Sequence, residues 1–348
     1  MSTVPVIHQT DVFHHHADPD DHWDLASQFA LAYNNEIDLK GVLVDYPPRA
    51  NFTGLDIGDP AIGAIAQLNY ITGQSIPIGI GTPHRVFKDE DTVKLMAEVP
   101  INGGIGMLLK TLQNAPDPVV IHIVGSCRDV AIAAKTHPEL FNKKCKAIYL
   151  NAGSSQSDSD LEYNVELDPY SYAAIFAIDC PVYWMPCFVA REKSNRFFQA
   201  QGGEYATYYR FQQESIFPSL SVSMRKYFEY ALGRVTDQRW LSYLSRPVDE
   251  GIILPHGQLY RNMWCTAGFL HTVGKTVTTE GDIVCAGMPG VQPVFEFVPI
   301  EITCNSDGRT NWNVSEKEGN RYIFRVCDVG KYGAAMTSAL KKLLATLP

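Results

Sequence analysis

Strand-like and helix-like segments alternate along the first two-thirds of the chain, and this alternation limits the possible folds more than any other feature. The expected strands are VPVIH at 4–8, GVLV at 41–44, IPIGI at 76–80, VVIHIV at 119–124, AIYL at 147–150 and PVYW at 181–184. The expected helices, marked by apolar residues at helical spacing, cover 22–33, 61–71, 105–112, 130–134 and 170–178. Strands that alternate with helices in this way form βαβ units. The sequence therefore predicts an α/β fold with a mainly parallel central sheet and flanking helices.

The later part of the chain is less regular. Residues 197–243 are rich in aromatic side chains and are expected to be helical, while 294–324 carries two β-like runs around a polar turn. A final helix is expected over 334–347. We therefore predict an α/β core over 1–290 and a β-rich C-terminal extension over 291–348 that packs on the same domain.

Composition excludes several classes of function. Of the 348 residues, 45% are hydrophobic and 19% are charged, which suits a chain with a large buried core. The net charge of -9 disfavours binding to nucleic acid or to an anionic membrane, because both are polyanions. No apolar run is long enough to cross a bilayer, and the N-terminus does not resemble a secretory signal. The eight cysteines show no CxxC spacing, so we expect reduced thiols in a cytoplasmic protein.

The segment TDVFHHHADPDDHWD at 10–24 lies between the first expected strand and the first expected helix. It holds five aspartates, namely Asp11, Asp18, Asp20, Asp21 and Asp24. Carboxylates that gather at one end of a sheet repel one another, and a divalent cation would offset that repulsion. Calcium suits such a site because it binds six to eight oxygen ligands. The alternative is an exposed acidic loop in which Asp20 or Asp21 caps the helix that follows.

Histidines in the same segment leave the identity of the metal undecided. His14, His15, His16 and His22 are the four histidines concerned. Imidazole nitrogens suit zinc, manganese or iron better than calcium, so these residues favour a transition metal if they bind one. The alternative for the histidine run is a solvated loop.

At this point the sequence resembles the inosine-uridine nucleoside hydrolase family, which opens with a strand followed by a DTDPGxDD-type motif. Here the strand leads into Gln9-Thr10-Asp11 and, after an insertion, into Asp20-Asp21. The resemblance implies that Asp11 activates water and binds calcium, and that Asp20 holds a ribose hydroxyl. It implies that Asp21 is a bidentate calcium ligand. Asp18 is an additional carboxylate without a counterpart, and we keep it as a further candidate ligand.

Three more segments match the family in order. IPIGIG at 76–81 resembles its third-strand segment, and VVIHIVGSCRDVAIAAKTHPEL at 119–140 resembles a strand-loop-helix in which a main-chain carbonyl binds the metal. Val124 fits that place. EYNVELDP at 162–169 resembles the family's EFNxxxDPEAA segment, which implies that Glu162 and Asn164 bind ribose hydroxyls. Asp168 followed by Pro169 suits the start of a helix, so we expect Asp168 to act as a cap.

The chain departs from the family at several positions. The family has a late His-Asp pair whose aspartate completes the calcium site, and here Trp264 and Cys265 stand in that place. Thiolate is a soft ligand and a poor one for calcium, so we expect this change to weaken calcium binding. Gln9 replaces the first aspartate of the family motif, and Asp45 lies near the place of an absent asparagine.

The acid that protonates the leaving base is expected in the aromatic region or near the late pair. The candidates are Tyr205, Tyr208, Tyr209, Arg210, His256 and Trp264. Of these, Trp264, Tyr209 and His256 are also candidates for contact with the substrate. The segment GGEYATYYRF at 202–211 would stack on a nucleobase or, alternatively, form a helix that packs its aromatic rings into the core.

The resemblance implies a metal-dependent hydrolase that cleaves the N-glycosidic bond of ribonucleosides to base and ribose. Calcium is the expected metal and a nucleoside is the expected partner, and the resemblance implies a homo-oligomer, either a dimer or a tetramer. Two alternatives stay open. One is a hydrolase of the same fold with a transition metal and another substrate, and the other is a degenerate protein that binds nucleosides without turnover.

Overall fold

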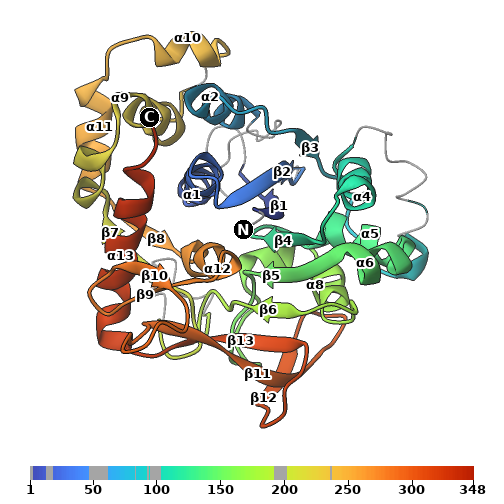
Figure 1. Ribbon diagram of the computed structural model, residues 1–348. Helices are drawn as coiled ribbons and strands as arrows, with labels where there is room; N and C mark the ends of the chain where they lie inside the picture. Colours follow the sequence, from blue (N-terminus) through green and yellow to red (C-terminus); the bar gives the residue numbers. More distant parts are fainter. Residues whose placement is uncertain are drawn as a thin grey trace.

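The computed structural model describes residues 3–12, 19–46, 62–82, 84–91, 94, 103–191, 202–235 and 237–348. In these residues the main feature is a nine-stranded sheet with the strand order β12-β11-β13-β6-β5-β4-β1-β2-β3 (Figure 1). The first six strands pair only in parallel. They are β1 (Val4–Thr10), β2 (Ile37–Val44), β3 (Ile78–Ile80), β4 (Val119–Ile123), β5 (Cys145–Leu150) and β6 (Val182–Trp184). This architecture confirms the predicted α/β fold, and each expected strand is present.

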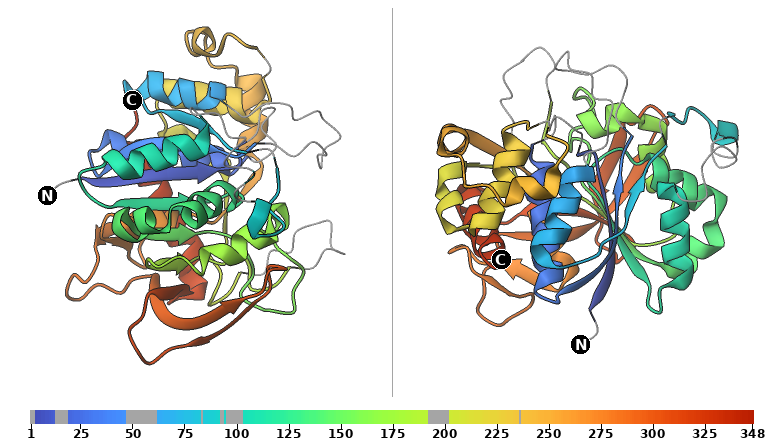
Figure 2. Two further views of the ribbon diagram at one scale, coloured as in Figure 1. Left: turned by 90° about the vertical axis from the view of Figure 1, so that its right-hand side faces the viewer. Right: turned by 90° about the horizontal axis from the view of Figure 1, so that it is seen from above.

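Helices cover both faces of the sheet, as the view from above shows (Figure 2). One face packs against α4 (Gly104–Asn114), α5 (Arg128–Thr136), α6 (Pro138–Lys144) and α8 (Pro169–Ile175). The other face packs against α1 (Asp21–Tyr33), α2 (Ile62–Thr72), α12 (Thr266–Thr272) and α13 (Val329–Leu344). The parallel strands are apolar on both sides, since β4 is buried at every position. The short helix α7 (Tyr163–Leu167) follows β5.

The strand order reverses between β1 and β4, because β2 and β3 lie on one side of β1 and the later strands lie on the other. In open parallel sheets such a switch point leaves a crevice outside the carboxyl ends of the two strands, and ligands bind there. The fold thus directs attention to the residues that directly follow β1 and β4.

Residues after 290 extend the same sheet. They form β11 (Phe295–Cys304), β12 (Thr310–Val314), β13 (Arg321–Val326) and α13. β13 lies between β6 and β11, parallel to the former and antiparallel to the latter. α13 packs against α1 and places Leu340 and Leu344 in the core that α1 shares. The helix begins five residues earlier than expected, because the Asp328 side chain caps it by accepting a hydrogen bond from the Lys331 amide.

The expectation of helix throughout 197–243 was wrong for part of that segment. Residues 209–212 form β7 (Tyr209–Gln212), which pairs antiparallel with β8 (Tyr260–Met263). Tyr209 and Phe211 are buried whereas Arg210 is exposed, so the segment alternates with the period of a strand. The aromatic composition fits either structure, and the pairing with β8 decides between them.

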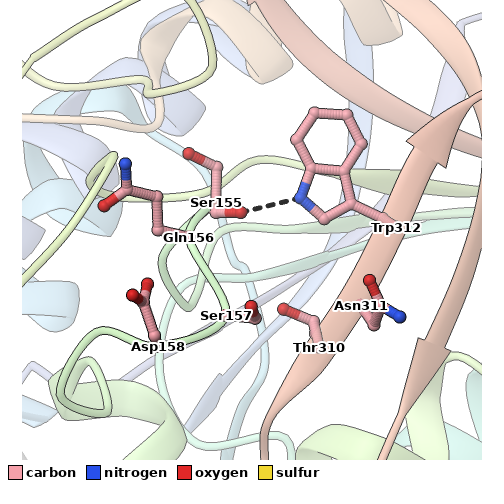
Figure 3. Close-up of a pocket in the computed structure, with 7 residues that line it drawn as sticks. All are labelled: Ser155, Gln156, Ser157, Asp158, Thr310, Asn311 and Trp312. Atoms are coloured by element: carbon pink, nitrogen blue, oxygen red, sulfur yellow. Dashed lines mark hydrogen bonds between the residues drawn. The ribbon is translucent and has the colours of Figure 1, made fainter.

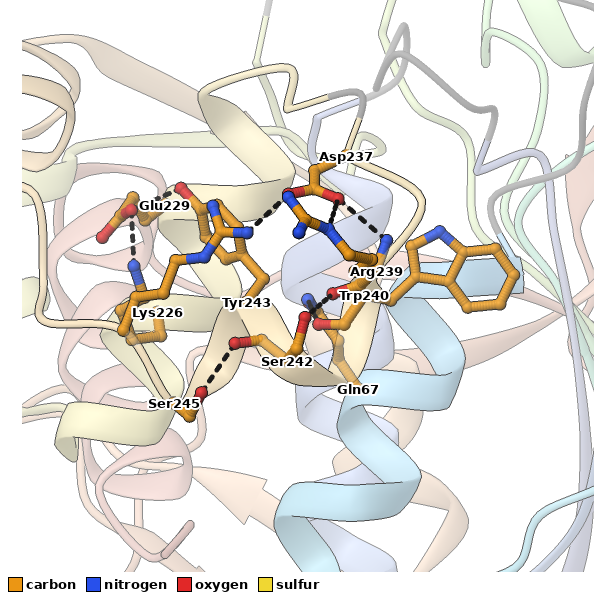
Figure 4. Close-up of polar contacts among 10 residues, drawn as sticks. Gln67, Lys226, Glu229, Asp237, Arg239, Trp240, Ser242, Tyr243 and Ser245 are labelled. Carbon is orange, nitrogen blue, oxygen red and sulfur yellow. Dashed lines mark hydrogen bonds and ion pairs between the residues drawn. The ribbon is translucent and has the colours of Figure 1, made fainter.

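A layer of short helices stands outside α2. It comprises η1 (Gln213–Ser215), η2 (Phe217–Ser219), α9 (Val222–Leu232), α10 (Trp240–Leu244) and α11 (Glu250–Gly257). A buried ion pair lies within α9, where Lys226 Nζ is 2.6 Å from Glu229 Oε1, and Glu229 ties α9 to α10 by accepting a hydrogen bond from the Tyr243 hydroxyl (Figure 4). The Lys226 ammonium also lies 4.1 Å from the centre of the Tyr243 ring. The layer joins the core where Gln67 of α2 donates a hydrogen bond to the Trp240 carbonyl.

The remaining strands, β9 (Lys275–Val277) and β10 (Ile283–Cys285), form a small antiparallel sheet. Within the described residues, no helix has the length and the apolar composition that crossing a membrane requires. All eight cysteines are free thiols.

Candidate functional site

Polar residues gather where four neighbouring parallel strands end. Asp11 follows β1, Asp45 follows β2, Val124 follows β4 and Asn151 follows β5. All four are buried. Because the carboxyl ends of parallel strands lie on one edge of the sheet, residues distant in sequence meet at the switch point between β1 and β4.

Asp11 and Asp21 are brought together by the chain between β1 and α1. The Asp11 amide donates to Asp21 Oδ2 over 3.0 Å, and the Thr10 hydroxyl donates to the same oxygen. The carboxylate of Asp21 is thus fixed at the end of β1. Asp20 occupies the N-cap position of α1, but its side chain makes no capping hydrogen bond. The alternative that the Asp20 side chain caps α1 is therefore not supported. The role of Asp20 in holding a ribose hydroxyl stays a prediction.

The Asp11 carboxylate is buried without compensation. Its exposed fraction is 1%, and neither carboxylate oxygen has a hydrogen-bond partner among the described residues. Burial, followed by the charges of Asp21 and Asp45, raises the pKa of Asp11 well above its ordinary value. Burial and the Asp20 charge raise the pKa of Asp21 to about 8. The two neighbouring carboxylates therefore need a proton or a cation to share the site.

Gln9 and Asp45 form a fixed polar network beside this pair. Gln9 Nε2 donates to Asp45 Oδ1 over 2.6 Å and also to the Ser126 carbonyl, while the Ser126 amide donates to Asp45 Oδ2 over 2.6 Å. Gly125 allows the close approach, because a Cβ atom there would lie 2.7 Å from Asp45 Oδ2 and 2.9 Å from the Asp11 nitrogen. Gln9 therefore acts as a neutral donor at a position where the family has an aspartate.

The Val124 carbonyl lies beside Asn164. Asn164 Nδ2 donates to that carbonyl over 3.0 Å, and the side-chain oxygen of Asn164 is buried without a partner among the described residues. Glu162 caps α7, since its carboxylate accepts hydrogen bonds from the amides of Asn164 and Gly153 over 3.0 and 2.9 Å. Asp168 caps α8 by accepting from the Ser171 amide over 3.0 Å, as expected. The structure thus places the Asn164 side chain against the Val124 carbonyl. Glu162 has a structural role as the N-cap of α7.

Cys265 directly precedes α12 and is buried. Its thiol donates to Asn151 Oδ1 over 2.9 Å. Burial and the Asp24 charge raise the pKa of the thiol well above its ordinary value. A protonated thiol is a poor metal ligand, because the thiolate is the binding form. This favours a structural role for Cys265 over that of a soft ligand.

The candidates for contact with the base fall into two groups. Trp264 lies beside Tyr208 and Phe188, with ring centres 5.9 and 5.7 Å away, and its indole nitrogen has no partner among the described residues. Tyr208 is half-buried and donates to Asn262 Oδ1 over 3.0 Å. Tyr209, by contrast, is buried in the core and bonded to Thr266.

The remaining candidates contact other parts of the molecule. Arg210 is exposed and lies over the ring of Tyr260, and His256 is in α11, where its carbonyl accepts a hydrogen bond from Gln213. Tyr205 packs against Trp312, with ring centres 5.0 Å apart.

The donor atoms of the described residues decide whether a metal ion fits this site. Among the described residues, no three side chains of the types His, Cys, Asp and Glu come together in a way that could hold a metal ion. Two carboxylates, from Asp11 and Asp21, do lie side by side, and the buried oxygens of Asp11 have no other partner. Oxygen donors suit a hard cation such as calcium. Asp18, His14, His15 and His16 lie outside the described residues, and His22 Nδ1 is 3.0 Å from the Tyr227 hydroxyl.

A polar pocket of about 350 Å³ opens between the loop after β5 and strand β12 of the extension (Figure 3). It is lined by Ser155, Gln156, Ser157, Asp158, Thr310, Asn311 and Trp312. Trp312 Nε1 donates to the Ser155 carbonyl over 2.7 Å, and Arg309 donates to the carbonyls of Ser157 and Ser159. The extension therefore supports the loop that leads to Glu162 and Asn164.

Sequence reasoning missed several residues of this edge. Ser126 and Asn151 carry no motif of their own, and only the convergence of the strand ends places them at the site. Asp24 stands in the acidic segment, and the sequence carried one signal for its position. It lies three residues after Asp21 in the expected helix, which places both side chains on the same side of that helix.

Comparisons with known proteins show which fold this chain shares. Solved structures superpose over nearly the full chain. The inosine-uridine preferring nucleoside hydrolase of Bacillus anthracis has a TM-score of 0.51 at 14% identity, and covers 98% of this chain and 100% of its own. The chain has the nucleoside hydrolase fold. The purine-preferring ribonucleoside hydrolase of Gardnerella vaginalis matches with a TM-score of 0.54 at 12% identity, and covers 98% of this chain and 99% of its own.

Sequence similarity to nucleoside hydrolases is local. No family model matches the chain. The pyrimidine-specific ribonucleoside hydrolase RihA of Citrobacter koseri is 29% identical over 80 residues, which is 22% of this chain and 26% of that protein. The matching segment thus spans about a quarter of the curated relative. The nucleoside hydrolase fold is shared over the whole chain, while the sequence has diverged widely.

Proposed function

We propose that this protein is a divergent nucleoside hydrolase that uses a divalent cation to cleave the N-glycosidic bond of ribonucleosides. The observation that carries the proposal is Asp11, whose two buried carboxylate oxygens, at the switch point of the sheet, have no hydrogen-bond partner among the described residues. Asp21 adjoins it, and the Val124 carbonyl and Asn164 follow the neighbouring strands. The fold shared with nucleoside hydrolases and the local similarity to a ribonucleoside hydrolase support the same function.

In the proposed reaction Asp11 is the general base. Cleavage passes through an oxocarbenium-like state, so the attacking water must lose a proton as the bond to the base breaks. A carboxylate suits that transfer, because it can accept the proton of a water held within hydrogen-bond distance. Asp20, Glu162 and Asn164 are proposed to hold the ribose hydroxyls, which fixes the ring against the water.

Asp11, Asp21 and the Val124 carbonyl are the proposed protein donors to the cation, and calcium is the preferred ion for this oxygen set. When bound, a divalent cation supplies positive charge that lowers the pKa of an adjacent water. Trp264 and Tyr208 are proposed to contact the nucleobase, since their rings lie together and the Trp264 indole N–H has no partner among the described residues.

The test is ribose release from a panel of purine and pyrimidine nucleosides, with calcium chloride and with chelator. We expect turnover that needs calcium. The variants Asp11→Asn and Asp21→Ala should each lower kcat/KM at least a thousandfold, because each removes a charge at the reacting atoms. Asp38→Asn is the matched control, since Asp38 is partly exposed on β2 and pairs with Lys40. Absence of turnover on every nucleoside, in protein shown to be folded, would contradict the proposal.

One observation favours a second candidate function. The described residues contain no group of three His, Cys, Asp or Glu side chains that could hold a metal ion. A protein that binds nucleosides without turnover would need only the ribose and base contacts. Nucleoside binding that persists in chelator, together with no ribose release, would select this alternative.

A further inference from the structure

Asp24 is a buried carboxylate without a role in the site described so far. It lies on α1, three residues after Asp21, so both side chains project from the same side of the helix. Its exposed fraction is 0%, and neither carboxylate oxygen has an N–H or O–H donor among the described residues.

Other buried aspartates of the described chain are satisfied. Asp168 accepts hydrogen bonds from the amides of Val86 and Ser171, and Asp129 accepts one from the Thr82 amide. Within the described residues, only Asp11 and Asp24 have two buried carboxylate oxygens without an N–H or O–H donor. Such a charge is too costly to leave uncompensated, so each position needs either a proton or a cation that the described side chains do not provide.

The neighbours of Asp24 connect it to the same cation as Asp11. Asp21 and Asp24 lie three residues apart on α1, which makes their side chains neighbours on the helix surface. The Cys265 thiol lies within hydrogen-bonding reach of Asp24 and also donates to Asn151 Oδ1. α1 and α12 are adjacent in the fold, so position 24 and position 265 reach the same space from two helices.

We propose that Asp24 supplies the negative charge that position 265 lacks, so that one carboxylate on α1 replaces one at the start of α12. The inference rests on the proposed function, because it concerns the cation of that site. Since no three such side chains converge on a metal position in the described residues, Asp24 acts through its charge next to Asp21 and not as a further direct ligand. It is a positioning residue for the cation.

The test is calorimetric titration of chelator-treated protein with calcium chloride. Asp24→Asn removes one charge and keeps the shape of the side chain, and we expect calcium affinity to fall about 10-fold to 100-fold. The double variant Asp24→Asn with Cys265→Asp moves the carboxylate back to α12 and should recover affinity to within about threefold of the parent protein. Asp38→Asn, which removes a partly exposed charge on β2, is the control for net charge and should bind like the parent.

The outcomes separate this inference from the proposed function. If the parent protein binds calcium and Asp24→Asn binds it equally well, the inference fails and the proposed cation site stands. If the parent protein binds no calcium, both fail together. Unfolding in urea without calcium guards against a folding defect, because Asp24→Asn removes an uncompensated charge and should be at least as stable as the parent protein. Loss of affinity in a stable variant that the double variant restores supports the inference.

Discussion

Gln9 shows how one residue adapts the strand end to its surroundings. Its amide nitrogen serves two acceptors, Asp45 and the Ser126 carbonyl, in a place crowded with carboxylates. An aspartate there would remove both donated bonds and add a charge beside Asp45. Gln9 therefore lowers the repulsion that the candidate site must overcome before any cation binds.

We expect Gln9→Asp to lower the free energy of unfolding by about 2–4 kcal/mol in the absence of divalent cations, because a buried acceptor loses its donor and like charges are brought together. Urea denaturation at pH 7.5 in chelator measures the change. Gln113→Asp, on the exposed side of α4, is the control and should change stability by no more than about 0.5 kcal/mol. A Gln9→Asp protein as stable as the parent would show that the network contributes nothing.

Much of the edge with Asp11 and Asp21 follows from the sequence, because the aspartate motif stands directly after a recognisable strand. The neighbours of Cys265 do not follow, since Asp24 and Asn151 reach it from α1 and β5 through tertiary packing. The strand at 209–212 was mistaken for helix because aromatic residues fit both structures, and its partner β8 lies about fifty residues away in the sequence.

At the scale of elements, β1, β4 and α12 enclose a layer of buried histidines. His8 lies edge-on to His122 with ring centres 6.4 Å apart, and His122 stacks on Phe269 at 5.0 Å. His271 Nδ1 is 2.7 Å from the Tyr149 hydroxyl. Burial lowers the pKa of His8 to about 3 and that of His271 to about 4, and it lowers the pKa of His122 well below its usual value. These side chains therefore pack as neutral rings.

This layer predicts a loss of stability in acid. The unfolded chain binds protons at histidine near pH 6.5, whereas the folded chain resists them until the lowered pKa is reached, so the contribution of these histidines to stability falls as the pH drops below about 6.5. Each histidine contributes a slope of about 1.4 kcal/mol per pH unit in that window. The carboxylates with raised pKa values change the free energy of unfolding in the opposite direction as the pH drops. A comparison of the parent protein with a histidine variant therefore isolates the contribution of that histidine.

We expect His8→Phe to make this slope shallower by about 1.4 kcal/mol per pH unit between pH 4 and 6, because it removes one titrating ring. Urea denaturation across that range gives the slope. His84→Phe replaces an exposed histidine and should leave the slope unchanged. Equal slopes for His8→Phe and the parent protein would mean that His8 does not stay neutral in the folded state.

At the scale of the whole molecule, the extension belongs to the central core. β13 continues the sheet next to β6, and Leu340 of α13 is fully buried in the cluster that includes α1. We expect Leu340→Ala to lower the free energy of unfolding by about 2–5 kcal/mol, through the cavity it leaves. Lys341→Ala, at the exposed neighbouring position, should have little effect.

Denaturant unfolding followed both by far-ultraviolet circular dichroism and by tryptophan fluorescence measures this effect. The two signals should change together in one transition, since the extension and the residues before 290 share one sheet and one core. Two separate transitions, of which only one moves in Leu340→Ala, would show that the extension unfolds independently.

The position of β13 has a consequence for the protein during its synthesis. β6 ends at Trp184, but its outer partner is not made until residues 321–326, so the growing chain carries an unpaired strand edge for most of the second half of translation. Unpaired edges of this kind bind other strands readily. The Arg309 and Trp312 contacts to the loop before Glu162 also form only near the end of synthesis. The loop before Glu162 therefore gains its support from the extension only after most of the chain has been synthesised.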